Sequence, residues 1–200
     1  LRRRVADKKR LAARYPHQVF WRYDPIVLSD LTPPDYHVNK FGELAERLRG
    51  YTTRCYFSFV DWYQKVRRNF ARAEEEHGVR FREAELAERI ALVHKLNALA
   101  RSNGLTLYSC CQDALCAVPE VAKAHCVDIE TIRALAPERY RRLCATPTRE
   151  ECGCFESRDI GYYDSCPHGC VYCYANRNRE RAQGFYEAYL QSRTLPLDED

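Results

Sequence analysis

No methionine occurs anywhere among the 200 residues of this chain. A complete translation product normally begins with methionine, so we expect the chain to be a fragment or an N-terminally truncated form. Strands and site residues upstream of Leu1 would then be missing from it.

The sequence also lacks any apolar run long enough to cross a bilayer, and its first residues carry no secretory signal pattern. Internal repeats and low-complexity segments are absent as well. These absences favour a cytoplasmic globular protein without a membrane partner.

The net charge is small, at +4, but basic residues gather near the start of the chain and again around positions 177–181. Such runs can contact phosphate groups. They are more often the solvated faces of helices. Nucleic acid is therefore only a secondary candidate for a partner.

Cysteine is abundant and clustered. Ten of the eleven cysteines lie between Cys110 and Cys173, and only Cys55 lies outside that range. Disulfides would need an oxidising compartment, and an odd number leaves one thiol unpaired. Clustered thiols in a reducing compartment point instead to a metal or an iron–sulfur cluster.

Strand and helix patterns alternate along the chain. Strands are predicted over 18–23, 52–60, 105–109 and 154–163, and helices over 32–50, 83–102, 128–144 and 176–193, the last with Phe185, Tyr186, Tyr189 and Leu190 inward. This alternation predicts an α/β fold with a parallel sheet, either a barrel or an open sheet. We expect βα units of a partial barrel over 1–150, then the last strand, a cysteine loop and a helix over 151–195, and a frayed tail over 196–200.

One cysteine motif carries specific chemistry. Cys166, Cys170 and Cys173 have the spacing C-x3-C-x2-C, with Gly169 allowing a tight turn. Three thiolates on one loop can each bind a different iron of a [4Fe–4S] cluster and leave the fourth iron open. Zinc remains an alternative, with Cys152 or Cys154 as a fourth ligand, although zinc sites usually show two separated C-x2-C pairs. A ferredoxin would show a different spacing.

The loop resembles a known cluster-binding loop. Residues 159–175, DIGYYDSCPHGCVYCYA, are similar to the loop of the radical S-adenosylmethionine (SAM) superfamily, in particular of spore photoproduct lyase-like proteins. The resemblance implies that SAM binds the open iron, with Tyr172 and Tyr174 near this cofactor. Reductive cleavage of SAM would give a radical that abstracts hydrogen from an unknown substrate. A flavodoxin or ferredoxin would supply the electron.

A second resemblance covers most of the chain. The strings WRYDPI (21–26), GYT (50–52), SFVD (58–61), CVD (126–128) and CGC (152–154) occur in this order in a bacterial family of unknown function, domain-of-unknown-function family 1848. Its C-terminal cysteines are likened to the radical SAM cluster. The loop follows the last predicted strand here, which implies a partial or permuted (β/α) barrel of radical SAM type.

A further group of cysteines suggests a second metal site. Cys110, Cys126, Cys152 and Cys154 could bind an auxiliary cluster or a structural zinc, and Cys111 or Cys116 could replace one of them. Alternatively, some of these are packed core thiols. For Cys55 and Cys144 we expect a place in the core.

Polar residues follow two of the predicted strands. Arg22 and Asp24 end one strand, and Ser58 and Asp61 end another. In a barrel these are candidate catalytic or substrate-binding residues, because barrel sites form at the carboxyl ends of strands. Arg22 and Asp24 could equally form a structural ion pair. Two other functions stay open: a zinc- or cluster-stabilised nucleic-acid-binding module and a closed iron–sulfur electron-transfer protein.

Overall fold

The structure is a computed structural model that describes residues 2–15, 19–139, 143–158 and 160–193. The chain divides into two compact units, of which the first comprises Leu1–Val60 with Phe81–Ser157 and the second Asp61–Arg80 with Arg158–Asp200. The expected frayed tail, 196–200, lies outside the described residues.

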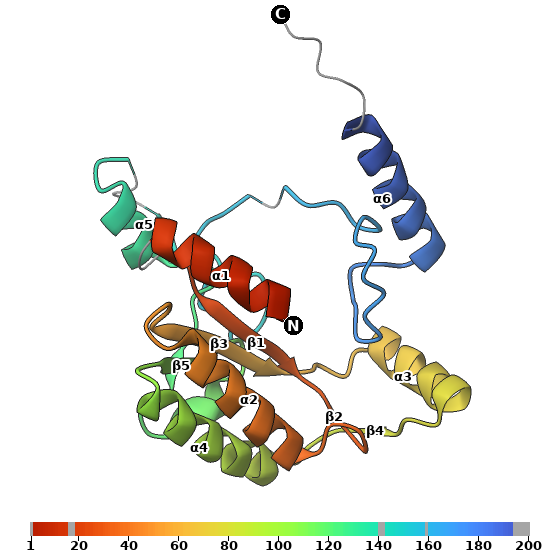
Figure 1. The fold of residues 1–200 in the computed structure, drawn as a ribbon, viewed down its shortest axis with the longest axis horizontal. Helices are drawn as coiled ribbons and strands as arrows, with labels where there is room; N and C mark the ends of the chain where they lie inside the picture. Colours follow the sequence, from red (N-terminus) through yellow and green to blue (C-terminus); the bar gives the residue numbers. More distant parts are fainter. Residues whose placement is uncertain (1, 16–18, 140–142, 159, 194–200) are drawn as a thin grey trace, which may run out of the picture. The chain divides into compact units, whose positions relative to one another are not determined.

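A parallel sheet forms the centre of the first unit (Figure 1). Its strands, in spatial order, are β1 (Trp21–Ile26), β3 (Arg54–Phe59), β5 (Thr106–Ser109) and β6 (Ala122–Lys123). Neighbouring strands therefore follow the order of the chain. The predicted α/β class with a parallel sheet is confirmed, and within the described residues the sheet stays open, without closure into a barrel.

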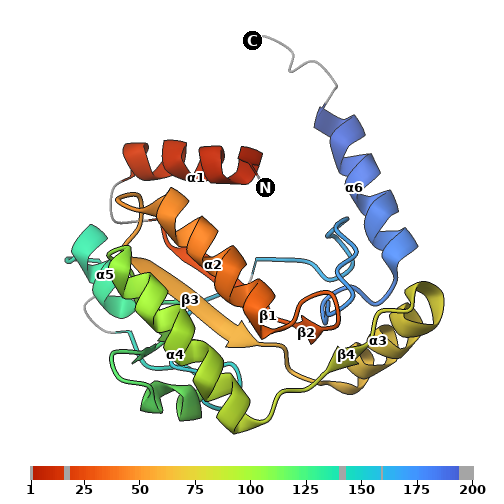
Figure 2. The same cartoon turned by 60° about the horizontal axis from the view of Figure 1, so that its bottom comes forward.

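Two helices cover one face of this sheet (Figures 1 and 2). They are α2 (Pro34–Leu48) and α4 (Leu86–Ser102), which pack against each other. The remaining elements of the unit are α1 (Arg2–Arg14), the antiparallel pair β2 (Leu28–Ser29) and β4 (Phe81–Arg82), the 3-10 turn η1 (Asp113–Ala117) and α5 (Ile129–Leu135).

The alternation of side chains along β3 makes the two faces of the sheet different. Cys55, Phe57 and Phe59 lie in the apolar core beneath the helices. Tyr56 belongs instead to a small cluster with Cys110 and Ala124. The face away from α2 and α4 therefore presents aromatic, polar and thiol side chains.

Helix α2 agrees closely with its prediction. It starts with a proline in its first turn, where the missing N–H costs nothing, and Gly50 with φ of +77° follows its end. Phe41, Leu44, Ala45 and Leu48, which recur at helical spacing in the sequence, are buried on one face of the helix. Helix α4 was also predicted. Its first residue, Leu86, is exposed and lies outside the core, whereas Leu92 and Asn97 are buried.

The second unit contains α3 (Gln64–His77), which the sequence patterns missed, and α6 (Arg179–Arg193). The inward face predicted for α6 is wrong, because Phe185, Tyr189 and Leu190 are each about half exposed. Their spacing places them on one face of the helix, but periodicity in the sequence does not show whether another element packs against that face. None of the helices in the described residues has both the length and the apolar character needed to span a membrane.

The prediction of a strand over 154–163 is also wrong. Within its described part, the structure has a single antiparallel bridge between Ala145 and Phe155. Phe155 also donates its N–H to Val127 O at 3.1 Å. The segment is therefore held by local contacts to neighbouring loops and not as a strand of the main sheet.

Asp128 ties α5 to the sheet and gives a prediction about pH. Its carboxylate accepts the Glu130 N–H at 3.0 Å as the helix cap and pairs with Arg54 on β3 at 2.6 Å. Burial is the largest single effect and opposes ionisation, but the hydrogen bonds from Arg54, Thr131 and the Glu130 N–H, with the charge of Arg54, together keep the pKa of Asp128 below its usual value. This stabilisation is complete above the unfolded pKa of about 3.9 and is lost as the pH falls through the folded pKa.

We therefore expect Asp128→Ala to lower the free energy of unfolding by about 1 kcal/mol near neutral pH. The loss should shrink towards zero at a pH below the folded pKa, where the wild-type carboxylate is also protonated. Urea unfolding at both pH values measures this, with the exposed Glu130→Ala as a control. An equal loss at the two pH values would contradict a role for the charge.

Candidate functional site

Two thiols meet at the carboxyl edge of the sheet. Cys110 directly follows β5 and Cys126 comes shortly after β6, and the ends of parallel strands lie at one edge. Their sulfur atoms are 3.5 Å apart. The sulfur of Cys111 lies 3.9 Å from that of Cys110. The structure thus brings together two of the four cysteines predicted for a second metal site.

The other two cysteines of that group come from a segment that folds back onto Cys126. The backbone N–H of Cys154 points to the sulfur of Cys152 at 3.5 Å, and the ring of His125 bonds to Gly153 O. A Cβ atom on Gly153 would lie 2.9 Å from Ala124 O. Glycine between the two cysteines is therefore what allows this close approach.

Polar side chains from β1 and β3 join the thiols. Arg22 donates from Nη1 to the sulfur of Cys126 at 3.2 Å and from Nη2 to Asp24 at 2.6 Å. Ser58 in turn donates to the second oxygen of Asp24. Three of the four predicted residues, Arg22, Asp24 and Ser58, therefore connect to the predicted thiol group, a link that the sequence patterns did not indicate. Arg22 lies near the start of β1, so its predicted place at the end of the strand is wrong.

The thiols of this site differ in acidity. A hydrogen bond with Cys110, together with the guanidinium of Arg22, lowers the pKa of Cys126 to about 5. The bond to Cys126 and burial raise the pKa of Cys110. Burial likewise raises the pKa of Cys154 to about 11, whereas at Cys152 hydrogen bonds with Thr148 and Cys154 outweigh burial and lower the pKa to about 6. Thiolates and thiols thus lie next to each other.

The C-x3-C-x2-C motif lies in the second unit, on a loop before α6. Cys166 and Cys170 are exposed and Cys173 is half-buried. The loop turns at Gly169, whose φ is +63°, and the Cys173 N–H bonds to Cys170 O at 3.0 Å. The backbone N–H of Asn176 donates to the sulfur of Cys173 at 3.4 Å. Hydrogen bonds of this kind to sulfur tune iron–sulfur clusters.

Helix α3 holds this loop in place. Lys65 donates to Tyr174 O at 3.1 Å and also to Asn176 O, and Asn69 donates to Val171 O at 2.9 Å. Lys65 and Asn69 are four residues apart and therefore share a helix face. Neither residue was predicted to support the loop, because no helix was predicted for this charged stretch.

The loop's donor set suits an iron–sulfur cluster in type and number, because three thiols from one loop can each bind a separate iron. Within the described residues, no three Cys, His, Asp or Glu side chains are grouped as ligands around one metal ion. The exposed side chains of Cys166 and Cys170 would have to turn towards Cys173 on binding. Exposed side chains change rotamer readily.

The other predicted site residues are dispersed. Asp61 belongs to the second unit, Tyr172 is half-buried, and the Tyr174 side chain is 70% exposed. Their roles stay predictions. Cys55 is fully buried in the core, as predicted, whereas Cys144 is exposed, so its predicted place in the core is wrong.

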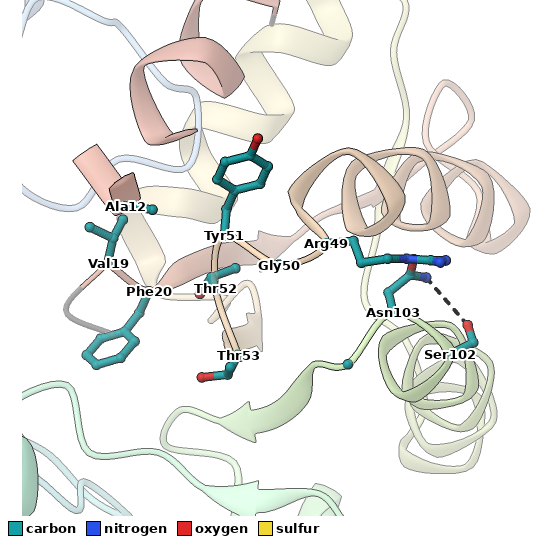
Figure 3. Close-up of a pocket in the computed structure, with 11 residues that line it drawn as sticks. Ala12, Val19, Phe20, Arg49, Gly50, Tyr51, Thr52, Thr53, Ser102 and Asn103 are labelled. Atoms are coloured by element: carbon teal, nitrogen blue, oxygen red, sulfur yellow. Dashed lines mark hydrogen bonds between the residues drawn. The ribbon is translucent and has the colours of Figure 1, made fainter. Parts of the chain in front are cut away.

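A cavity of about 370 Å³ lies at the opposite, amino end of the strands (Figure 3). Tyr51, Thr52 and Thr53 line it just before β3, and Ser102 and Asn103 just before β5. Sites of parallel α/β proteins form at the carboxyl ends of strands, so we assign this cavity no catalytic role.

Comparison with protein families gave a match over most of the chain. The model of a family described as domain of unknown function (DUF1848) matches residues 1–175. This confirms the second resemblance noted in the sequence. Neither the curated proteins nor the solved structures contain a match to the chain.

Proposed function

Because the chain belongs to the family of domain of unknown function DUF1848, we propose that it is an iron–sulfur enzyme of radical SAM type acting on an unknown substrate. Cys166, Cys170 and Cys173 hold the [4Fe–4S] cluster in this proposal. The observation that carries it is the C-x3-C-x2-C spacing on one accessible loop, which leaves one iron open. When bound, the cluster supplies the electron that cleaves SAM reductively.

The chain's own residues position this chemistry. The Asn176 N–H donates a hydrogen bond to the Cys173 sulfur and so helps to orient this ligand. Lys65 and Asn69 restrain the backbone of the loop by bonding its carbonyl oxygens. Tyr172 and Tyr174 would contact SAM. The electron would come from a flavodoxin or ferredoxin.

The fold proposed for the whole enzyme is a partial or permuted (β/α) barrel. The order β1-β3-β5-β6 supports it, because neighbouring strands of such barrels follow the chain, whereas doubly wound sheets reverse at a switch point. Ser58 lies near the carboxyl end of β3, whereas Arg22 is the second and Asp24 the fourth residue of β1. A role for these three residues in binding substrate is part of the proposal.

The test is anaerobic reconstitution with iron and sulfide, followed by EPR of the reduced chain with and without SAM. We expect about four irons per chain bound by the loop and a spectrum that changes when SAM is added. A cluster that ignores SAM would favour an electron-transfer protein. No iron uptake, combined with salt-dependent binding of nucleic acid, would favour the nucleic-acid-binding module. Either of these results overturns the proposal.

A further inference from the structure

We propose that Cys110, Cys126, Cys152 and Cys154 form a structural zinc site at the carboxyl edge of the first unit's sheet. The site is independent of the loop that carries Cys166, Cys170 and Cys173, because all four ligands belong to the first unit. Its function would be to fasten the segment around Cys152 to the ends of β5 and β6.

The sulfur spacing favours a single metal ion over a cluster. Thiolates around a tetrahedral zinc lie about 2.3 Å from the metal, which places any two sulfurs about 3.7 Å apart. Cys110 and Cys126 have their sulfurs at 3.5 Å. In a [4Fe–4S] cluster each cysteine binds a different iron, so its sulfurs would be spread around the whole cubane. The observed pair matches one shared ion.

The second pair of ligands is delivered by a close backbone contact. Phe155 N–H bonds to Val127 O, and Gly153 packs against Ala124 with no room for a Cβ atom. The side chain of Cys154 interacts with those of both Cys126 and Cys152. The four thiols therefore form an unbroken series of neighbours from the end of β5 to Cys152.

Charge also favours a cation bound by thiolates. Four thiolates around Zn²⁺ leave a net charge of −2, which must be offset nearby. The guanidinium of Arg22, itself anchored by Asp24, lies 3.2 Å from the Cys126 sulfur. Such a partner outside the ligand shell orients a ligand and strengthens metal binding.

Binding of one ion requires the thiol side chains to rotate. Within the part of the chain that the structure describes, no three of these four sulfurs surround a common point. Cys126 is exposed and Cys152 half-buried, so zinc can reach the pair and draw the remaining thiols in. Zinc sites commonly complete their geometry only as the metal binds.

The decisive experiment uses the whole chain in which Cys166, Cys170 and Cys173 are replaced by alanine, so that failure of the iron–sulfur proposal does not affect the result. We expect this parent to bind about one Zn²⁺ per chain, measured by mass spectrometry of dialysed protein. Adding Cys126→Ser should reduce the bound zinc to near zero. Adding Cys144→Ser, which changes an exposed thiol outside the site, should not.

Two further measurements test the zinc site without relying on Cys126→Ser, in case that variant does not fold. In the parent, alkylation of the four site thiols should be at least ~10-fold slower with zinc than after chelation, whereas Cys144 should react equally fast. Arg22→Gln should weaken zinc affinity about 10–100-fold in competition with a chromophoric chelator. Zinc retained by Cys126→Ser, alkylation rates that ignore zinc, or uptake of iron and sulfide in place of zinc would each overturn the proposal.

Discussion

Cys170→Ala is expected to remove essentially all iron bound by the C-x3-C-x2-C loop, from about four irons per chain to near zero, together with any response to SAM. Cys170 is the middle ligand of the motif, next to the turn at Gly169. Loss of one thiolate would leave two irons of the cubane without protein ligands, and no nearby thiol on the loop replaces it. Iron and sulfide analysis with EPR measures the change.

Cys144→Ala is the matched control for this variant. Cys144 is an exposed thiol of the first unit, outside the motif, so its replacement should leave iron content and the SAM response unchanged. Cys166→Ala and Cys173→Ala should behave like Cys170→Ala. If Cys144→Ala loses as much iron as Cys170→Ala, the assignment of the ligands is wrong.

Leu107→Ala should lower the free energy of unfolding by about 2–5 kcal/mol, the range for a leucine removed from a packed core. Leu107 is fully buried on β5 and lies opposite Cys55 of β3 in the register of the sheet. The change removes apolar contacts and leaves a cavity between the sheet and its helices. A loss of this size is a large part of a typical domain's 5–15 kcal/mol, so equilibrium denaturation detects it readily.

Leu31→Ala provides the same chemical change on the surface of the same unit. The Leu31 side chain is 68% exposed, and its replacement should shift the free energy of unfolding by no more than about 0.5 kcal/mol. If Leu107→Ala lowers the free energy of unfolding as little as Leu31→Ala does, Leu107 is not part of the core.

Local patterns predicted three strands of the sheet, β1, β3 and β5, together with helices α2 and α4, but missed β6. Phe41, Leu44 and Leu48 recur at helical spacing between a proline start and a glycine stop, and α2 forms there with these residues buried. The parallel arrangement followed from the alternation of strands and helices. The patterns failed for two helices. Helix α3 was hidden by its charge, and the apolar residues of α6 indicated a buried face that is half exposed.

The candidate sites show the same division. The three thiols on the C-x3-C-x2-C loop were readable because ligands spaced three or four residues apart must lie on one turn of chain. The supporting contacts of Lys65 and Asn69 were not readable, because they come from a helix about a hundred residues earlier in the sequence.

By itself, the sequence determined the family, the α/β class with a parallel sheet and the presence of the three-cysteine loop, since periodicity, spacing and residue order are properties of the chain alone. Only the tertiary structure decided that Arg22, Asp24 and Ser58 form one site with Cys110 and Cys126. Arg22 and Cys126 are 104 residues apart, and parallel pairing of the strands between them brings their side chains into contact. No local signal encodes such a contact, because it depends on the register of every strand between the two residues.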